Sequence, residues 1–222
     1  MTANQPSTMV AHKGSTIRPY TRLVRLHLAS RRYQTALVTV LACAAALRIA
    51  LHWPWNAYGA LQLPLVAEAG CAVAIAATTA SPFGEAERVG GGRLPWLRFG
   101  VPLSLCGVAA AALACAGVGT HLAGGNVEML RNLLGLTGIG LLCAVVLSGG
   151  LAWTGPTAYL IIGVYGLYTL WHGPALTTPW IWPAHPANDI GAAVCAVITF
   201  VLGLLMITMR GARDSSDDGP TR

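Results

Sequence analysis

The sequence predicts an all-α integral membrane protein with six membrane-spanning helices and with both chain termini in the cytoplasm. Three observations lead to this prediction: the composition is strongly apolar, six long apolar segments recur, and arginine gathers on one side of them. Of the 222 residues, 55% are hydrophobic and 10% are charged, whereas a soluble globular domain carries about a quarter charged residues. A chain this apolar would expose large hydrophobic surfaces to water, so the bilayer is its natural solvent.

The N-terminal part of the chain is polar and basic. Residues 1–15 show no apolar period and are expected to be disordered. Residues 16–32 are expected to form an amphipathic helix in the headgroup plane, with Arg18, Arg22 and Arg25 facing anionic lipid phosphates. The alternative, a merely basic juxtamembrane tail, remains open.

The transmembrane domain is expected at 33–210, followed by a disordered tail at 211–222. Each predicted span is close to the ~20 residues that cross ~30 Å of hydrocarbon. The six predicted spans are Gln34–Trp53, Leu61–Thr79, Phe99–Gly119, Asn132–Gly150, Thr157–His172 and Ile190–Met209.

The positive charges orient these spans. Arginine is concentrated in the N-terminal region, in the loop at 80–98 and after the last span, whereas the segments assigned to the outside hold only Arg131. The positive-inside rule then places both termini in the cytoplasm of a multi-pass protein of the cell membrane. Trp96 would anchor the inner interface, where indole rings are enriched.

The composition also argues against several classes of function. The net charge of +6 lies next to apolar segments, which fits membrane orientation and anionic lipid better than nucleic acid. The six cysteines lack paired spacing and the histidines match no ligand motif, so no disulfide framework and no metal site are expected. The chain has no phosphate-binding G-x-x-x-x-G-K-[ST] loop and no hydrolase motif. We therefore expect no enzymatic activity and no cofactor bound by this chain, and any energy must come from another chain or from an ion gradient.

The loop at 80–98 is a charge-rich interruption between the second and third spans. Ser81 is a good helix N-cap and Pro82 a good first helical residue. A short helix over Pro82–Arg88 is expected to dock on a soluble partner, and a solvated turn is the alternative. The residues expected to contact that partner are Pro82, Phe83, Glu85, Glu87 and Arg88.

The proline-rich segment at 173–189 precedes the last span. Its four prolines rule out a regular helix, yet Trp180, Ile181 and Trp182 are too apolar for a freely solvated loop. We expect a short external cap or re-entrant element that folds back onto the helices.

Two ionisable residues lie within the spans, Arg48 late in the first and Glu68 early in the second. Both lie roughly 8–10 Å from the outer ends, where an unpaired charge costs about 2.5–3.5 kcal/mol or more. They are expected to form an intramembrane polar pair, either a structural ion pair or a polar element of a substrate path. In a third alternative, Arg48 reaches out to the interface and pairs with nothing. Glu128 and Arg131 are expected to form a surface pair of little consequence.

Small residues mark two expected helix-packing faces, because they let membrane helices approach closely. The face in the third span consists of Gly107, Ala111 and Cys115, and the face in the fourth span consists of Gly135, Gly138 and Gly140.

The chain resembles a compact permease subunit of ABC-2-type exporters, of the actinobacterial type. The resemblance lies in the segment SPFGEAER in the loop, the segment RNLLGLTGIGLL at the fourth span, the basic amphipathic helix and the proline-rich outer element. The resemblance covers nearly the whole chain as an architecture. It implies pairing with a second permease subunit, as a homodimer or heterodimer, and coupling to a separate ATP-binding subunit that holds ATP and Mg. It also implies that Pro82–Arg88 is the coupling helix, Arg18–Arg32 the elbow helix and Ala175–Asn188 the re-entrant element. The very short, uncharged loop between the fourth and fifth spans departs from the family pattern.

The expected function is therefore export of an apolar or amphipathic substrate, with this chain forming the pathway and a partner hydrolysing ATP. Two alternatives stand beside it. One is a membrane scaffold or accessory protein that transports nothing, and the other is a secondary transporter that uses Arg48 and Glu68.

Overall fold

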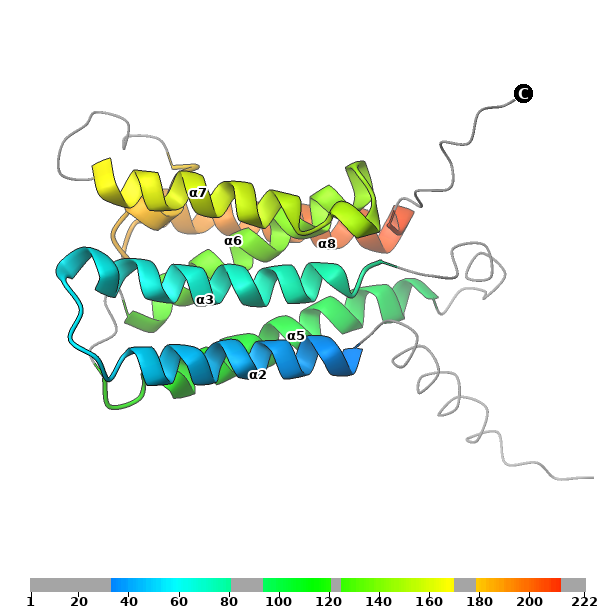
Figure 1. Cartoon of the computed structure of the whole chain (residues 1–222). Coiled ribbons are helices and arrows are strands. Elements are labelled where there is room, and N and C mark those ends of the chain that lie inside the picture. Colours follow the sequence, from blue (N-terminus) through cyan, green and yellow to red (C-terminus); the bar gives the residue numbers. More distant parts are fainter. Residues whose placement is uncertain (1–32, 81–93, 121–124, 170–178, 213–222) are drawn as a thin grey trace, which may run out of the picture.

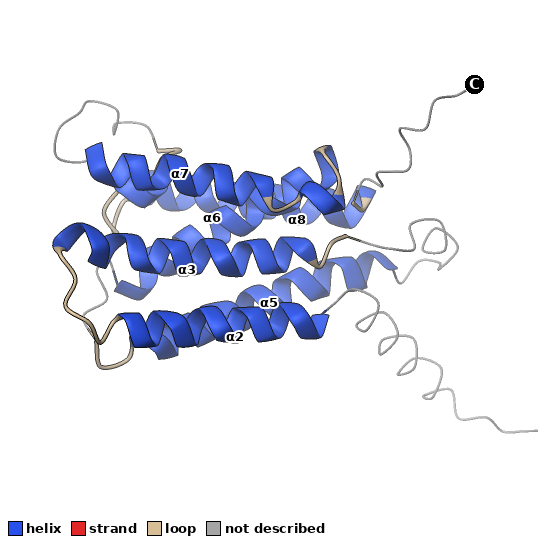
Figure 2. Cartoon of the chain, in the orientation of Figure 1, coloured by secondary structure: helices blue, strands red, loops and turns tan. Residues whose placement is uncertain are grey.

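The computed structural model describes residues 33–80, 94–120, 125–169 and 179–212, and the regular structure in these ranges is entirely helical. Six α-helices alternate in direction through one bundle (Figure 1), and the described residues outside them form 3₁₀ turns, loops and bends (Figure 2). The predicted all-α class is confirmed. The helices are α2 (Tyr33–Ala50), α3 (Ala57–Ala77), α5 (Leu94–Gly117), α6 (Gly125–Val146), α7 (Thr154–Thr169) and α8 (Ile190–Arg210), with the 3₁₀ turns η1 (Gly149–Leu151) and η3 (Trp182–Ala184).

Five of these helices, all except α7, are long and apolar enough to cross a membrane. Helix α7 has 16 residues, which rise roughly 24 Å and so fall short of the ~30 Å of a hydrocarbon core. By length and composition, five of the six predicted spans are therefore supported.

Five helices begin earlier than the predicted spans, and three of them, α3, α5 and α6, do so by four residues or more. Helix α5 begins at Leu94 rather than Phe99, so the loop predicted at 80–98 is too long at its C-terminal end. Helix α3 begins at Ala57 rather than Leu61 because Asn56 caps it, and the Asn56 side chain accepts a hydrogen bond from the Gly59 amide at 2.7 Å. Helix α6 begins at Gly125 rather than Asn132. Its first two turns carry charged residues, so an apolar pattern alone does not reveal them.

Helix α6 packs against α3, α5, α7 and α8, and its most extensive partner is α8. Glycines let these two backbones touch: a Cβ added to Gly138 would lie 2.6 Å from the Phe200 backbone, and one added to Gly203 would lie 2.6 Å from the Gly138 carbonyl oxygen. Gly135 and Gly140 are similarly tight against η3 and α3. The packing face predicted in the fourth span is confirmed.

The packing face predicted in the third span is wrong for this bundle. Gly107, Ala111 and Cys115 are all exposed on the surface of α5, and a Cβ added to Gly107 would meet nothing within 4 Å. Spacing shows that small residues share a helix face, but it does not show whether that face turns toward the other helices.

Candidate functional site

Charged and amide side chains are buried where α3, α6 and the segment 179–189 meet. Glu68 of α3 is 1% exposed, and Arg131 and Asn132 of α6 are 3% and 4% exposed. Glu68 shares its helix face with Leu65 and Ala72, which pack in one core cluster with residues of α6, because residues three and four apart lie on the same side of a helix. We call Glu68, Arg131 and Asn132 the buried polar cluster.

Arg131 binds the irregular segment rather than the surface. Its Nη1 donates to the Pro186 carbonyl oxygen and its Nη2 to the His185 carbonyl oxygen, both at 2.8 Å, and Glu128 Oε1 lies 3.8 Å from Nη2. The predicted surface pair with Glu128 is therefore wrong in its location, because Arg131 is buried. The proline-rich segment was the available signal, since its carbonyl groups need donors wherever they are shielded from water.

The described part of the proline-rich segment, 179–189, folds against α6, α7 and α8. Ile181 and Trp182 are buried, and the Trp182 ring stacks on Tyr159 of α7 with 4.4 Å between ring centroids. The Tyr159 hydroxyl donates to the Trp180 carbonyl oxygen at 2.6 Å. Gly135 of α6 leaves the space that the Trp182 ring fills. Residues 173–178 of the predicted element lie outside the described residues.

Asp189 joins this segment to α8. Its Oδ1 accepts a hydrogen bond from the Ala192 amide at 3.0 Å, as an N-cap of the helix, and its Oδ2 lies 2.7 Å from His185 Nδ1. The backbone amide of Ala192, and next the His185 ring, hold the pKa of Asp189 below its usual value of 3.8. The segment is thus bound at three places, by Arg131, by Tyr159 and by Asp189.

Glu68 is the carboxyl group among the buried side chains that lack a hydrogen-bond partner within the described residues, whereas Thr137 Oγ1 and Trp182 Nε1 are uncharged groups without one. Among the described residues, neither of its carboxylate oxygens has a hydrogen-bond partner, and the same is true of Asn132 Oδ1. The Asn132 side chain is its polar neighbour, and the nearby charged groups are Glu128 and Arg131. A buried carboxylate without a donor is costly, so this side chain is a candidate for function rather than for stability.

The predicted pair of Arg48 and Glu68 does not form. Arg48 Nη1 donates to the Ala116 carbonyl oxygen at 3.1 Å and also to the Val118 carbonyl oxygen, at the C-terminal end of α5. The last carbonyls of a helix lack intrahelical donors and attract cations. Arg48 and Glu68 lie at similar depths in neighbouring helices, but similar depth is not enough for them to pair. The Arg48 side chain is directed toward α5 and the Glu68 side chain toward α6.

Of the other residues predicted to contact a partner or the lipid, Trp96 is the one that the structure describes. Pro82, Phe83, Glu85, Glu87 and Arg88 lie outside the described residues, and so do Arg18, Arg22 and Arg25. Trp96, in the first turn of α5, is 77% exposed on the bundle surface.

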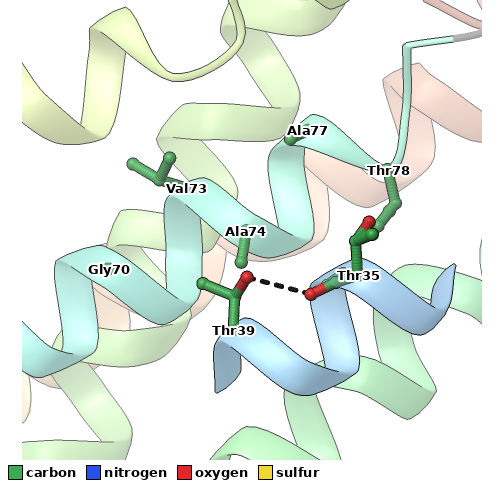
Figure 3. A pocket seen from close by; sticks show the side chains of 8 residues that line it. Thr35, Thr39, Gly70, Val73, Ala74, Ala77 and Thr78 are labelled. Carbon is green, nitrogen blue, oxygen red and sulfur yellow. Dashed lines mark hydrogen bonds between the residues drawn. The ribbon is translucent and has the colours of Figure 1, made fainter. Parts of the chain in front are cut away.

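A groove of about 270 Å³ lies between α2 and α3, away from the buried polar cluster. Figure 3 shows small side chains and threonines around it. Thr39 Oγ1 donates to the Thr35 carbonyl oxygen at 2.9 Å, and Thr78 Oγ1 donates to the Ile75 carbonyl oxygen at 2.7 Å. Because these hydroxyl groups bond to their own helices, the groove offers mostly carbon surface.

Within the described residues, no group of three or more His, Cys, Asp or Glu side chains could hold a metal ion. No family model, no curated protein and no solved structure matches this chain.

Proposed function

We propose that all six helices cross the membrane, α7 included, with both chain termini in the cytoplasm. Two observations support this topology. The beginning of α2 and the end of α8 lie at the same end of the bundle (Figure 1), and the segments that begin or end there carry most of the arginines. A span of only 16 residues is tolerated when the bilayer thins locally around it.

We further propose that the chain is the membrane subunit of an ABC-2-type exporter and pairs with a second permease subunit. The observation that carries this proposal is the buried polar cluster inside an otherwise apolar bundle. Ionisable side chains within membrane helices are expensive and mark pathways for substrates or ions. A scaffold that only holds a partner needs no such interior.

The energy for transport would come from a separate subunit that binds ATP and Mg. This chain has no phosphate-binding loop, and its charged segment between the end of α3 at Ala77 and the beginning of α5 at Leu94 lies at the proposed cytoplasmic end. ATP-driven closure of the partner would move this loop and reorient the helices. The substrate would be lipid-like, peptidic or amphipathic, because the surfaces of the spans offer almost no charge.

The test is purification in mild detergent with its partner, followed by measurement of ATP hydrolysis. The double variant Glu85→Arg/Arg88→Glu keeps the net charge and should reduce ATPase activity at least tenfold or release the partner. The matched control is Arg213→Glu/Asp214→Arg in the C-terminal tail, which makes the same exchange and should leave the activity unchanged. A chain that purifies without any ATPase, or a complex whose ATPase ignores the loop variant, contradicts the proposal.

A second candidate function is secondary transport through Glu68, without Arg48, which is bound at the end of α5. The observation in its favour is that Glu68 is buried and accepts no hydrogen bond among the described residues. In cells, efflux that stops when the proton gradient collapses, at constant ATP, and that is lost in Glu68→Gln, would favour this candidate over the first.

A further inference from the structure

We propose that Glu68 and Asn132 form a proton-binding site inside the bundle, in which Glu68 is a neutral carboxylic acid that shares its proton with the Asn132 amide. This inference concerns the protein at rest. It holds whether ATP or an ion gradient drives transport, so its test is independent of the proposed function.

Glu68 and Asn132 are buried, and their side-chain oxygens have no hydrogen-bond donor among the described residues. Glu68 is 1% exposed and Asn132 is 4% exposed, and three oxygen atoms of this pair have no donor among the described residues. An ionised carboxylate in such a place loses its hydration, and the neighbouring Asn132 side chain offsets little of that cost. A protonated carboxyl group does not carry that cost.

The charges around Glu68 would not balance if its carboxyl group were ionised. Arg131 of α6 lies near three carboxylates, Glu128, Asp189 and Glu68, and Glu128 is the one within 4 Å of its guanidinium. Both terminal nitrogens of Arg131 also donate to backbone carbonyls. One cation cannot neutralise three carboxylates. The side chains of Glu128 and Asp189 keep 15% and 30% of their exposure, so Glu68, which is 1% exposed, is the carboxyl group that takes the proton.

Within the described ranges, the other elements around Glu68 supply no further cation. On α2, Arg48 binds the end of α5. Cys43 of α2 and Cys106 of α5 bring thiols close to Cys71 on α3, and thiols carry no positive charge. The guanidinium of Arg98 on α5 lies over Gly211 at the end of α8. On α7, the Tyr159 hydroxyl donates to the Trp180 carbonyl oxygen.

The hydrogen-bonding groups of Asn132 match those of a neutral carboxylic acid. An amide offers a carbonyl oxygen that accepts and an NH₂ group that donates, and a carboxylic acid offers the reverse set. The acid O–H would donate to Asn132 Oδ1 while the amide donates to the acid carbonyl, which satisfies the orphaned oxygens of both residues. A bound metal cation fits less well, because three oxygens are fewer than hard cations take and Arg131 is already close.

The experiment is infrared spectroscopy of the full-length protein in mild detergent near neutral pH. Exposed carboxyl groups are ionised there, so a carbonyl-stretch band of a protonated carboxyl group reports a buried acid. We expect one such band, absent from Glu68→Gln and retained in Glu128→Gln. In Asn132→Leu the band should move to higher frequency, because the acid carbonyl loses its donor.

Labelling the unsubstituted protein with ¹³C-glutamate keeps the test valid if a variant does not fold, since the band must then shift without any substitution. Three results would overturn the proposal: no band at all, a band that survives Glu68→Gln, or a band that ignores labelled glutamate. Loss of the band on adding sodium at constant pH would also overturn it, because the site would then hold a metal ion in place of the proton.

Discussion

Arginine has a common role at the scale of single residues, because three of these side chains lie against the backbone of another segment. Arg48 binds carbonyls at the end of α5 and Arg131 binds carbonyls of the segment 179–189. The Arg98 guanidinium lies over Gly211, where α8 ends with φ at 73°. A guanidinium has five N–H donors in a planar fork, so it can bind helix-end carbonyls that nothing else satisfies.

Replacement of Arg131 should show how much its two hydrogen bonds to the segment 179–189 contribute to stability. Arg131→Met leaves two carbonyls without their donor and should lower the free energy of unfolding by about 3–5 kcal/mol. Arg131→Lys keeps the charge but reaches one carbonyl at a time, so it should cost about half as much. Thermal unfolding in detergent measures both, with the exposed Arg210→Met as the control. Equal unfolding temperatures for Arg131→Met and the control would show that the hydrogen bonds from Arg131 to the segment 179–189 do not stabilise the fold.

Asp189 predicts a dependence of stability on pH. Its pKa is lowered in the folded chain by the Ala192 amide and by His185, so it stabilises the fold above its usual pKa of 3.8 and loses this contribution as pH falls through the lower, folded value. Asp189→Asn still caps α8 but no longer titrates. We expect acid to lower the unfolding temperature of the unsubstituted chain more than that of the variant. Parallel curves for the two would refute the role of Asp189.

At the scale of elements, the contact between α6 and α8 depends on glycine. Gly138→Ala would place a methyl group 2.6 Å from the Phe200 backbone, so the helices must separate, at about 1–3 kcal/mol for overpacking. Gly107→Ala is the matched control, since it meets nothing within 4 Å and alanine favours a helix. Unfolding temperature in detergent should fall for the first variant and stay level or rise for the second. A fall of the same size in both would refute the packing role.

Helices were easier to predict from this sequence than the faces they present. Apolar length and breakers suffice to find α2, α3, α5, α6 and α8, because these are local properties. Whether a face turns inward depends on contacts between distant segments. This is why the small residues around Gly107 were misjudged and those around Gly138 were not.

The candidate site was only half predictable for the same reason. A charge in an apolar segment singled out Glu68, since its cost is visible in sequence alone. Its partner is set by how α3 and α6 cross, so Asn132 was missed and Arg48 was chosen wrongly. Arg131 lies close to the polar end of α6 in the sequence, where nothing local reveals that segment 179–189 covers it.

At the scale of the whole molecule, the proposed topology can be tested by cysteine labelling in intact cells. In a chain with Cys115→Ala, since Cys115 is the exposed native thiol among the described residues, a membrane-impermeant maleimide should reach His52→Cys and Asn188→Cys. It should reach Glu85→Cys only after lysis, because the positive-inside rule assigns that loop to the cytoplasm. Labelling of Glu85→Cys from outside would invert the bundle and remove the basis for a cytoplasmic partner.

The bonds from Arg48 to the end of α5 span 68 and 70 positions of the chain. A ribosome therefore makes α2 well before the acceptors of its arginine exist. On the proposed topology, the newborn hairpin of α2 and α3 carries this guanidinium unsatisfied, at about 2.5–3.5 kcal/mol if it enters the hydrocarbon. Stable insertion of α2 thus depends on the later helix α5. A nascent chain that ends before α5 would keep α2 inserted in the bilayer less stably.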